Sequence, residues 1–141
     1  MRHVARLGEI HDPGVDAALL AEDDLGRLVG ILTYDAQATD CEVSTLYART
    51  RRGGIGTALI EAVVEVARQA GCRRLWLVTT NDNVDALRFY QRRGFRLAAL
   101  HAGAVDRSRA TLKPSIPEIG EHGIPIRDEL VLEQTLSPGT P

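Results

Sequence analysis

The sequence predicts an α+β domain in which helices flank one mixed, mostly antiparallel sheet. Three observations support this prediction. Strand-like segments separated by short turns come first, a glycine-rich turn then joins a strand to an amphipathic helix, and a strand-helix-strand unit follows. We expect a single domain over residues 1–136 and a short tail over residues 137–141.

The first half of the predicted sheet is a meander. Residues 1–16 are short and mixed, with Asp12-Pro13-Gly14 as a turn. After them, apolar and β-branched residues bounded by aspartate and glycine turns predict three antiparallel strands. These strands are Ala17–Glu22, Arg27–Tyr34 and Cys41–Tyr47, with turns at Asp23–Gly26 and Asp35–Asp40.

The second half alternates helices and strands. An apolar stripe predicts a helix over Ile55–Ala70 that ends at Gly71. The apolar run Arg74–Thr80 is typical of a strand buried on both faces. Asn83 is a predicted N-cap of the next helix, and Gly94 its C-terminal stop with Phe95 as hydrophobic partner. The remaining predictions are a strand over Arg96–His101, a helical turn over Asp106–Leu112, an ordered loop or lid over Lys113–Arg127, and a strand over Glu129–Leu136.

Composition bounds the class of protein. With 141 residues, 44% of them hydrophobic and 26% charged, the chain can bury a core of its own. A formal net charge of -2 gives no basic footprint, so no nucleic-acid partner is expected. Cys41 and Cys72 are expected to be buried thiols, not a disulfide or a metal site. No signal peptide and no membrane span are predicted, so we expect a cytoplasmic location. We also expect no bound metal.

The most informative segment is the glycine-rich turn Arg51 to Gly56, which reads R-R-G-G-I-G. Glycines let the backbone approach a ligand closely, and the first N–H groups of the following helix favour an anion. Arg51 and Arg52 add forked donors that suit phosphate oxygens. The segment therefore predicts a phosphate-binding turn.

Two nucleotide-binding patterns fit this turn poorly. The dinucleotide fingerprint needs a small residue where Leu59 stands and an acidic residue about 20 positions later, where Arg73 to Trp76 is basic and aromatic. The P-loop pattern needs a lysine, and the chain's lysine, Lys113, is far from the turn. A nucleotide-binding protein of the doubly wound class stays a weaker alternative.

A second segment supports a different ligand. Asn83 to Phe95 reads N-V-D-A-L-R-F-Y-Q-R-R-G-F. Together, R-x-x-G-x-G and N-x-x-A-x-x-x-Y-x-x-x-G-F resemble the GNAT superfamily of acetyl-CoA dependent N-acetyltransferases. The first motif matches that family's pyrophosphate loop at Arg51, Gly54 and Gly56, and the resemblance spans Cys41 to Leu100.

The resemblance implies direct transfer of an acetyl group from acetyl-CoA, as co-substrate, to a primary amine of an unidentified acceptor. Tyr90 is the expected donor to the leaving thiolate. Asn83 is placed for a pantetheine contact as well as for its cap. The coenzyme-binding residues that the resemblance implies are Leu46, Tyr47, Arg51, Arg52, Gly53, Gly54, Ile55, Gly56, Thr57 and Asn83. A non-catalytic acyl-CoA sensor of the same fold is the alternative function.

The predicted proton acceptor is Glu42. Family members often use a carboxylate on the strand before the loop, and Asp40, Glu42 and Ser44 share one face of that strand by the period of two. Glu42 is preferred because it lies mid-strand, where a carboxylate is unusual; a solvent-facing glutamate is the alternative. Further candidates are Asp128, Glu129, His101 and His122.

The opening of the chain departs from the family resemblance. GNAT domains usually begin with an additional strand and one or two helices before the meander, and sixteen residues cannot supply all of these. We therefore predict a shortened N-terminus that lacks the usual opening strand and helices. This predicts a shortened variant, a start set too late, or a site completed by a partner chain. A homodimer is the predicted assembly, with Glu129–Leu136 and the proline-rich segment as contributors.

Overall fold

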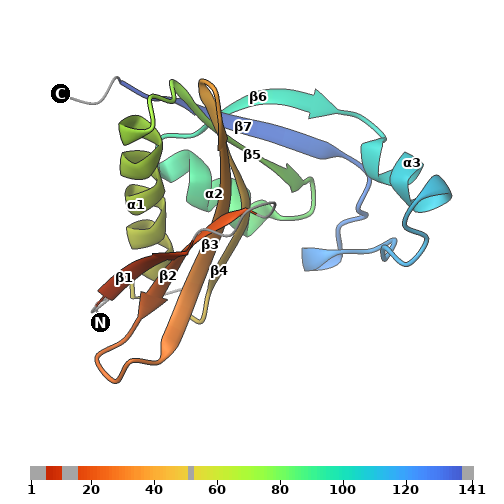
Figure 1. Cartoon of the computed structure of the whole chain (residues 1–141). Helices are drawn as coiled ribbons and strands as arrows, with labels where there is room; N and C mark the ends of the chain where they lie inside the picture. Colours follow the sequence, from red (N-terminus) through yellow and green to blue (C-terminus); the bar gives the residue numbers. More distant parts are fainter. Residues whose placement is uncertain (1–5, 11–15, 51–52, 138–141) are drawn as a thin grey trace. The chain divides into compact units, whose positions relative to one another are not determined.

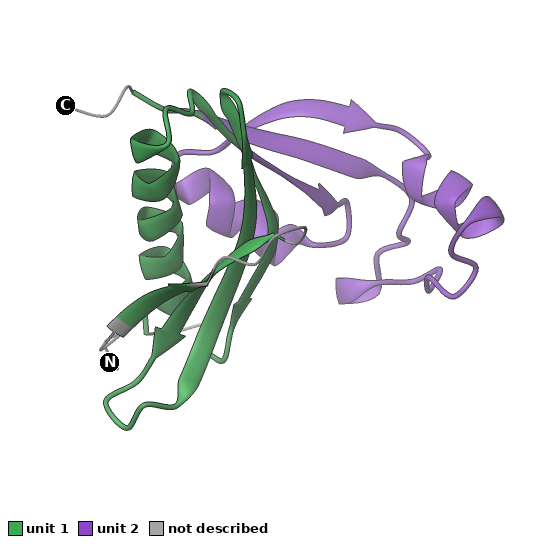
Figure 2. Cartoon of the chain, viewed as in Figure 1, with its two compact units in different colours: residues 1–75, 135–141 green, residues 76–134 purple. Residues whose placement is uncertain are grey.

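The computed structural model describes residues 6–10, 16–50 and 53–137, and these residues fold into two compact units. The first unit comprises residues 1–75 with 135–141, and the second comprises residues 76–134 (Figure 2). Seven strands and three α-helices lie in the described part of the chain. The predicted α+β class, with mostly antiparallel strands, is confirmed.

The first unit is an antiparallel meander with one helix on it (Figure 1). Its elements are β1 (Arg6–Ile10), β2 (Ala17–Glu22), β3 (Leu28–Gln37), β4 (Asp40–Ala48) and α1 (Ile55–Gln69). The three strands that were predicted are present. The prediction that the chain lacks an opening strand is wrong, because β1 pairs with β2 from Arg6↔Glu22 to Ile10↔Ala18.

Helix α1 covers the apolar face of β2, β3 and β4 and forms the core of the first unit. Alternation along the strands places one set of side chains under the helix. The buried residues are Leu19, Ala21, Leu32, Tyr34, Cys41 and Val43 from the strands, and Ile55, Leu59, Ile60, Val63 and Ala67 from the helix. Each large side chain in this set stabilises the fold by roughly 1.5–3 kcal/mol through burial.

A hydrogen bond links strand β1 to this core. The Tyr34 hydroxyl donates to the Glu9 carboxylate of β1, and the Tyr34 ring is buried. Burial, then the hydrogen bond to Glu9, raises the pKa of Tyr34 well above its usual range. This phenol therefore stays protonated as the donor that joins β1 to β3.

The second unit carries the strand-helix-strand segment. Its elements are β5 (Arg74–Thr80), which begins at the end of the first unit, and then α2 (Val84–Arg92), β6 (Arg96–His101), α3 (Ala104–Thr111), the short 3₁₀ helix η1 (Glu121–Gly123) and β7 (Glu129–Thr135). Strand order is β5-β7-β6, with β6 and β7 antiparallel. The predicted helical turn near Asp106 is the helix α3.

Strand β7 is an interior strand, because it lies between β5 and β6. Its backbone is therefore occupied on both edges, and the predicted role of Glu129–Leu136 as the strand that contacts a second copy does not fit this position. Strand β6 lies at one edge of the sheet, and all six of its residues are exposed. Leu97 and Leu100 of β6 are 54% and 62% exposed.

The segment Lys113–Arg127 is ordered by hydrogen bonds to Arg109 of α3. The Arg109 guanidinium donates to the carbonyls of Ile116 at 3.0 Å, Pro117 at 2.7 Å and Ile126 at 2.9 Å. One guanidinium, with its five N–H donors, therefore satisfies three carbonyls of this segment. The prediction of an ordered loop is confirmed.

Among the described residues, no helix has the length and apolar character needed to cross a membrane.

Candidate coenzyme and catalytic site

The glycine turn that precedes α1 has the backbone conformation that its glycines predict. Gly53 has φ of 100° and Gly54 has φ of 77°, both in the left-handed region that favours glycine. Gly54 is the N-cap of α1, and this glycine supplies no side-chain hydrogen bond to the helix start. Arg51 and Arg52 lie outside the described residues.

The start of α1 has the properties of an anion site. A helix leaves the N–H groups of its first turn without carbonyl partners in the helix, and its dipole is positive there. Ile55, Gly56 and Thr57 form that first turn, which carries no acidic residue. A Cβ built on Gly54 would meet nothing within 4 Å, so there is open space beside the turn.

Packing against β3 fixes this helix start. A Cβ on Gly30 would lie 2.6 Å from Ile55 Cγ2 and 3.2 Å from the Tyr47 carbonyl oxygen, so glycine at this position lets the helix approach the strand. The Ile55 side chain is 3% exposed and belongs to the core. Only its backbone is therefore available to a ligand. Gly30 was not predicted, although a glycine inside a strand can indicate the close approach of another element.

A β-bulge alters the strand that leads to the turn. Thr33 pairs with Thr45, while Tyr34 pairs with Val43, so Ser44 is an extra residue in β4. Bulges re-aim the side chains that follow them. Leu46 and Tyr47, whose backbone is predicted to bind the pantetheine, follow this bulge in the chain. Leu46 is half-buried and Tyr47 is 57% exposed.

Glu42 lies among acidic and hydroxyl side chains of the first unit. It pairs across the strands with Asp35, and the Ser44 hydroxyl bonds the Thr33 hydroxyl at 2.8 Å and donates to Asp16. Burial, then the charges of Asp16 and Asp35, raises the pKa of Glu42. Directly opposed like charges destabilise a sheet, and such conflicts concentrate at functional sites.

The other strand carboxylate has a structural partner. Asp40 forms an ion pair with Arg74 at 3.3 Å, between β4 and the start of β5. This contact accounts for Asp40 without a catalytic role and agrees with the preference for Glu42.

In the second unit, Asn83 caps α2 as predicted. Its side-chain oxygen accepts from the Ala86 N–H at 3.3 Å, and its Nδ2 donates to the Thr79 hydroxyl at 3.3 Å. The cap and the bond to Thr79 therefore each use one polar atom of the Asn83 side chain. The coenzyme contact of Asn83 stays a prediction.

Tyr90 sits at the C-terminal turn of α2. The N–H of Phe95 donates to the Tyr90 carbonyl at 3.1 Å and the N–H of Gly94 donates to the Gln91 carbonyl at 3.3 Å, which is a Schellman end. The Tyr90 ring lies edge-on to Phe89 and Phe95, at centroid distances of 5.3 and 5.5 Å. The predicted stop at Gly94 and the contact of Phe95 are confirmed.

Burial raises the pKa of Tyr90 to about 12. The phenol is therefore protonated throughout the neutral range, which keeps it available as a hydrogen-bond donor. The same shift makes it a weaker acid than an ordinary tyrosine. Its chemistry is better suited to donating a hydrogen bond to an anion than to giving the proton away.

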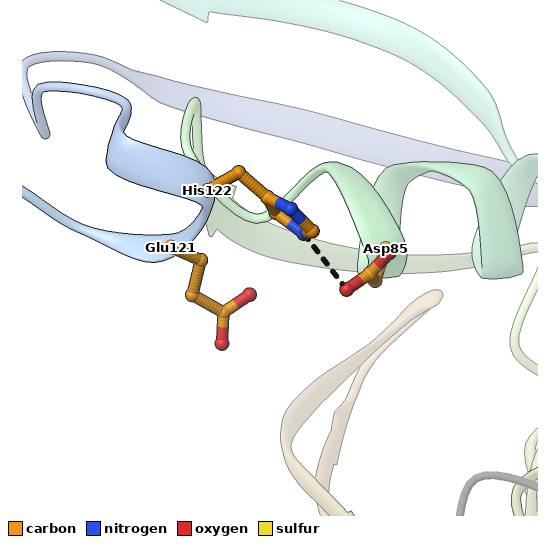
Figure 3. Close-up of side chains that lie close together, drawn as sticks. All are labelled: Asp85, Glu121 and His122. Carbon is orange, nitrogen blue, oxygen red and sulfur yellow. Dashed lines mark hydrogen bonds and ion pairs between the residues drawn. The ribbon is translucent and has the colours of Figure 1, made fainter.

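The further site residues predicted near the loop Lys113–Arg127 differ in their contacts. Asp128 accepts from the Gly103 N–H at 2.8 Å, and Asn81 accepts from the N–H groups of Arg127 and Asp128, so these contacts hold the loop. His122 instead contacts Asp85 of α2, with 3.0 Å between Nε2 and Oδ2 (Figure 3). The contacts of Asn81 with Arg127 and of Asp82 with Glu121 were not predicted, because each joins residues about 40 positions apart.

Comparison with known proteins gives one consistent family. A model described as the acetyltransferase (GNAT) family matches residues 3–95. The uncharacterized protein YdhI of Bacillus subtilis is 45% identical over 116 residues, which are 82% of this chain and 72% of YdhI. The streptothricin acetyltransferase of Streptomyces lavendulae is 31% identical over 78% of this chain and 61% of that protein.

A solved structure agrees on the fold. The structure of a Bacillus subtilis acetyltransferase in complex with CoA superposes with a TM-score of 0.78 and 20% identity, over 94% of this chain and 97% of that one. At this identity the likeness concerns the fold alone. The prediction of the fold from two short motifs is thereby confirmed.

Proposed function

We propose that this chain, which belongs to the acetyltransferase (GNAT) family and is an acetyl-CoA-dependent acyltransferase, acetylates a primary amine by direct attack. The observation that carries the proposal is the start of α1 behind two left-handed glycines, a geometry suited to the coenzyme pyrophosphate. The solved relative with CoA supports the same coenzyme.

Each part of the first unit has a role in this proposal. Backbone N–H groups of Gly54 to Thr57 hold the pyrophosphate, with Arg51 and Arg52 as charged donors. Backbone groups of Leu46 and Tyr47 hold the pantetheine amides as an added strand would. Asn83 is proposed to contact the pantetheine, and Tyr90 is proposed to act in the reaction.

The reaction needs one base and one anion stabiliser. Glu42, directly or through water, accepts the proton that the amine loses as its nitrogen bonds to the acetyl carbonyl carbon. The carbon–sulfur bond then breaks, and its electron pair leaves on the coenzyme sulfur as a thiolate. The Tyr90 hydroxyl donates a hydrogen bond to that thiolate. Its high pKa favours this role over complete proton transfer.

Two measurements test the function. Acetyl-CoA should raise the melting temperature of the protein, whereas NAD and ATP should not. Release of coenzyme thiol with a panel of amines should then separate an enzyme from a non-catalytic acyl-CoA sensor. A streptothricin belongs in the panel, because one relative is named for that acceptor. Thermal stabilisation without turnover on any amine would favour the sensor.

The environment of Glu42 predicts a pH dependence. Glu42 must be ionised to accept a proton, and its pKa is raised. As the pH decreases, kcat/KM should therefore begin to fall at a higher pH than it would with an ordinary glutamate, whose pKa is about 4.3. Asp35→Asn removes one of the charges that raise the pKa. This variant should therefore shift the acid limb of the kcat/KM profile to lower pH.

The matched control for that experiment is Asp24→Asn, a similar change in an exposed turn. It should leave the acid limb in place. Glu42→Gln should lower kcat/KM about 10²-fold and remove the limb. An unchanged profile in Glu42→Gln would assign the proton to another group.

The edge strand suggests how copies of the chain would associate. Exposed strand edges and apolar side chains favour pairing with another chain, and β6 offers both. We therefore propose a homodimer that uses β6, and a cytoplasmic location that agrees with the free, buried Cys41 and Cys72.

Sedimentation at micromolar concentration should show the dimer. Leu100→Lys places a charge on the edge strand and should shift the protein toward the monomer. Leu112→Lys, at another exposed leucine, is the control and should leave the dimer intact. A monomer at all concentrations would contradict the proposal.

A further inference from the structure

A histidine and two carboxylates from separate segments meet on the second unit. Asp85 lies in the first turn of α2, and Glu121 and His122 lie in η1. One ligand atom from each of the three residues lies within 4.8 Å of the others. Figure 3 shows the His122 ring directed at the Asp85 carboxylate, at 3.0 Å, with Glu121 beside them.

The chain holds this arrangement by contacts outside the cluster. The buried Asp82 carboxylate accepts from the Glu121 N–H at 3.0 Å and from the Thr80 hydroxyl. Gly120 fits against it only as glycine, because a Cβ there would be 2.2 Å from Asp82 Oδ2.

The residues that flank η1 also contact one another. Ile119 and Pro125 form a β-bridge, and the Gly120 N–H donates to the Ile124 carbonyl at 2.8 Å. The segment around Glu121 and His122 is therefore a closed turn tied to the start of α2. Little ordering is left to be done when a ligand binds, which favours affinity.

The donor set points to a cation. Asp85 and Glu121 are both acidic, and Arg88, one positive neighbour of Asp85, lies at 3.6 Å with a side chain that is 71% exposed. Two ligands about 2.0–2.2 Å from one tetrahedral zinc ion lie about 3.3–3.6 Å apart. The imidazole nitrogen and the carboxylate oxygen, now 3.0 Å apart, therefore need to separate only slightly to admit the ion. One imidazole with two carboxylates suits zinc-like ions better than magnesium or calcium, which prefer oxygen alone.

We propose that Asp85, Glu121 and His122 bind one divalent transition-metal ion of the Zn²⁺ type, with water completing its coordination. The site goes beyond the acyl transfer proposed above and beyond the sequence prediction of no bound metal. The ion replaces the His122–Asp85 hydrogen bond by two coordinate bonds. It thereby joins η1 to the first turn of α2, the helix that also carries Tyr90.

The test uses the full chain without a histidine tag. Calorimetric titration with Zn²⁺ should show one site, and Co²⁺ should give visible absorption bands of a protein-bound ion. His122→Asn removes the imidazole and keeps a residue that tolerates the left-handed backbone at φ of 57°. This variant and Asp85→Asn should each weaken Zn²⁺ binding at least tenfold.

The control is His101→Asn, which removes an exposed histidine of β6 that lies outside the cluster. Zn²⁺ binding should be unchanged in this variant. Absence of Zn²⁺ binding to the wild-type chain, equal binding in His122→Asn, or equal loss in His101→Asn would each overturn the site. Circular dichroism of every variant confirms that the fold is retained, and Asp85→Asn decides the result should His122→Asn unfold.

Discussion

Tyr90→Phe should lower kcat about 10²-fold, which corresponds to about 2.7 kcal/mol of lost transition-state stabilisation. The phenylalanine ring keeps the edge contacts to Phe89 and Phe95, so the fold and the end of α2 should be preserved. The affinity for acetyl-CoA should change little, because the hydroxyl acts on charge that develops on sulfur during the reaction. Single-turnover kinetics with a saturating amine measure this step directly.

Tyr47→Phe is the matched control. It also removes one phenolic hydroxyl, from a side chain that is 57% exposed and for which only backbone contacts are proposed. Its kcat should stay within about twofold of the wild type. Wild-type turnover in Tyr90→Phe would show that Tyr90 serves only the packing of the Schellman end.

Gly56→Val should weaken acetyl-CoA binding tenfold or more, about 1.4 kcal/mol, while the protein stays folded. Gly56 lies inside α1 and is not among the described residues with positive φ, so the loss would come from the side chain at the helix start and not from strain. Gly54 is less informative for this purpose. Its φ of 77° would strain any replacement, and binding and folding would change together.

Glu61→Val introduces the same β-branched residue at an exposed position of α1 and serves as the control for helix propensity. Its acetyl-CoA affinity should equal that of the wild type. Gly56→Ala adds a second comparison, since alanine favours helical backbone more than glycine does. A more stable protein with weaker coenzyme binding is expected, and unchanged affinity in Gly56→Val would refute the assignment.

Elements with local signals were predictable from the sequence. The strands Arg74–Thr80 and Arg96–His101 have the predicted bounds, and α1 ends one residue earlier than predicted. Both predicted glycine stops are Schellman ends, at Gly71 and Gly94, because glycine alone adopts the left-handed conformation there without strain.

Features set by tertiary contacts were not predictable. Strand β3 extends to Gln37 because the hairpin turns at Ala38, with φ of 53°, where the sequence has none of the usual turn residues. Strand β1 has only five residues, and its contact between Glu9 and Tyr34 spans 25 positions. The bulge at Ser44 and the anchor at Asp82 depend on a partner strand and a distant loop, respectively. The division into one domain and a tail stays a prediction.

The two buried thiols of the first unit have a practical consequence. Cys41 and Cys72 are 0% and 2% exposed, and burial raises the pKa of Cys41 to about 12 and also raises that of Cys72. Thiolates are the reactive species, so the native chain should hardly consume a colorimetric disulfide reagent. Coenzyme released during turnover can then be counted without a protein background. Any slow labelling of the two thiols would then report how often the first unit opens, and so would measure its local stability.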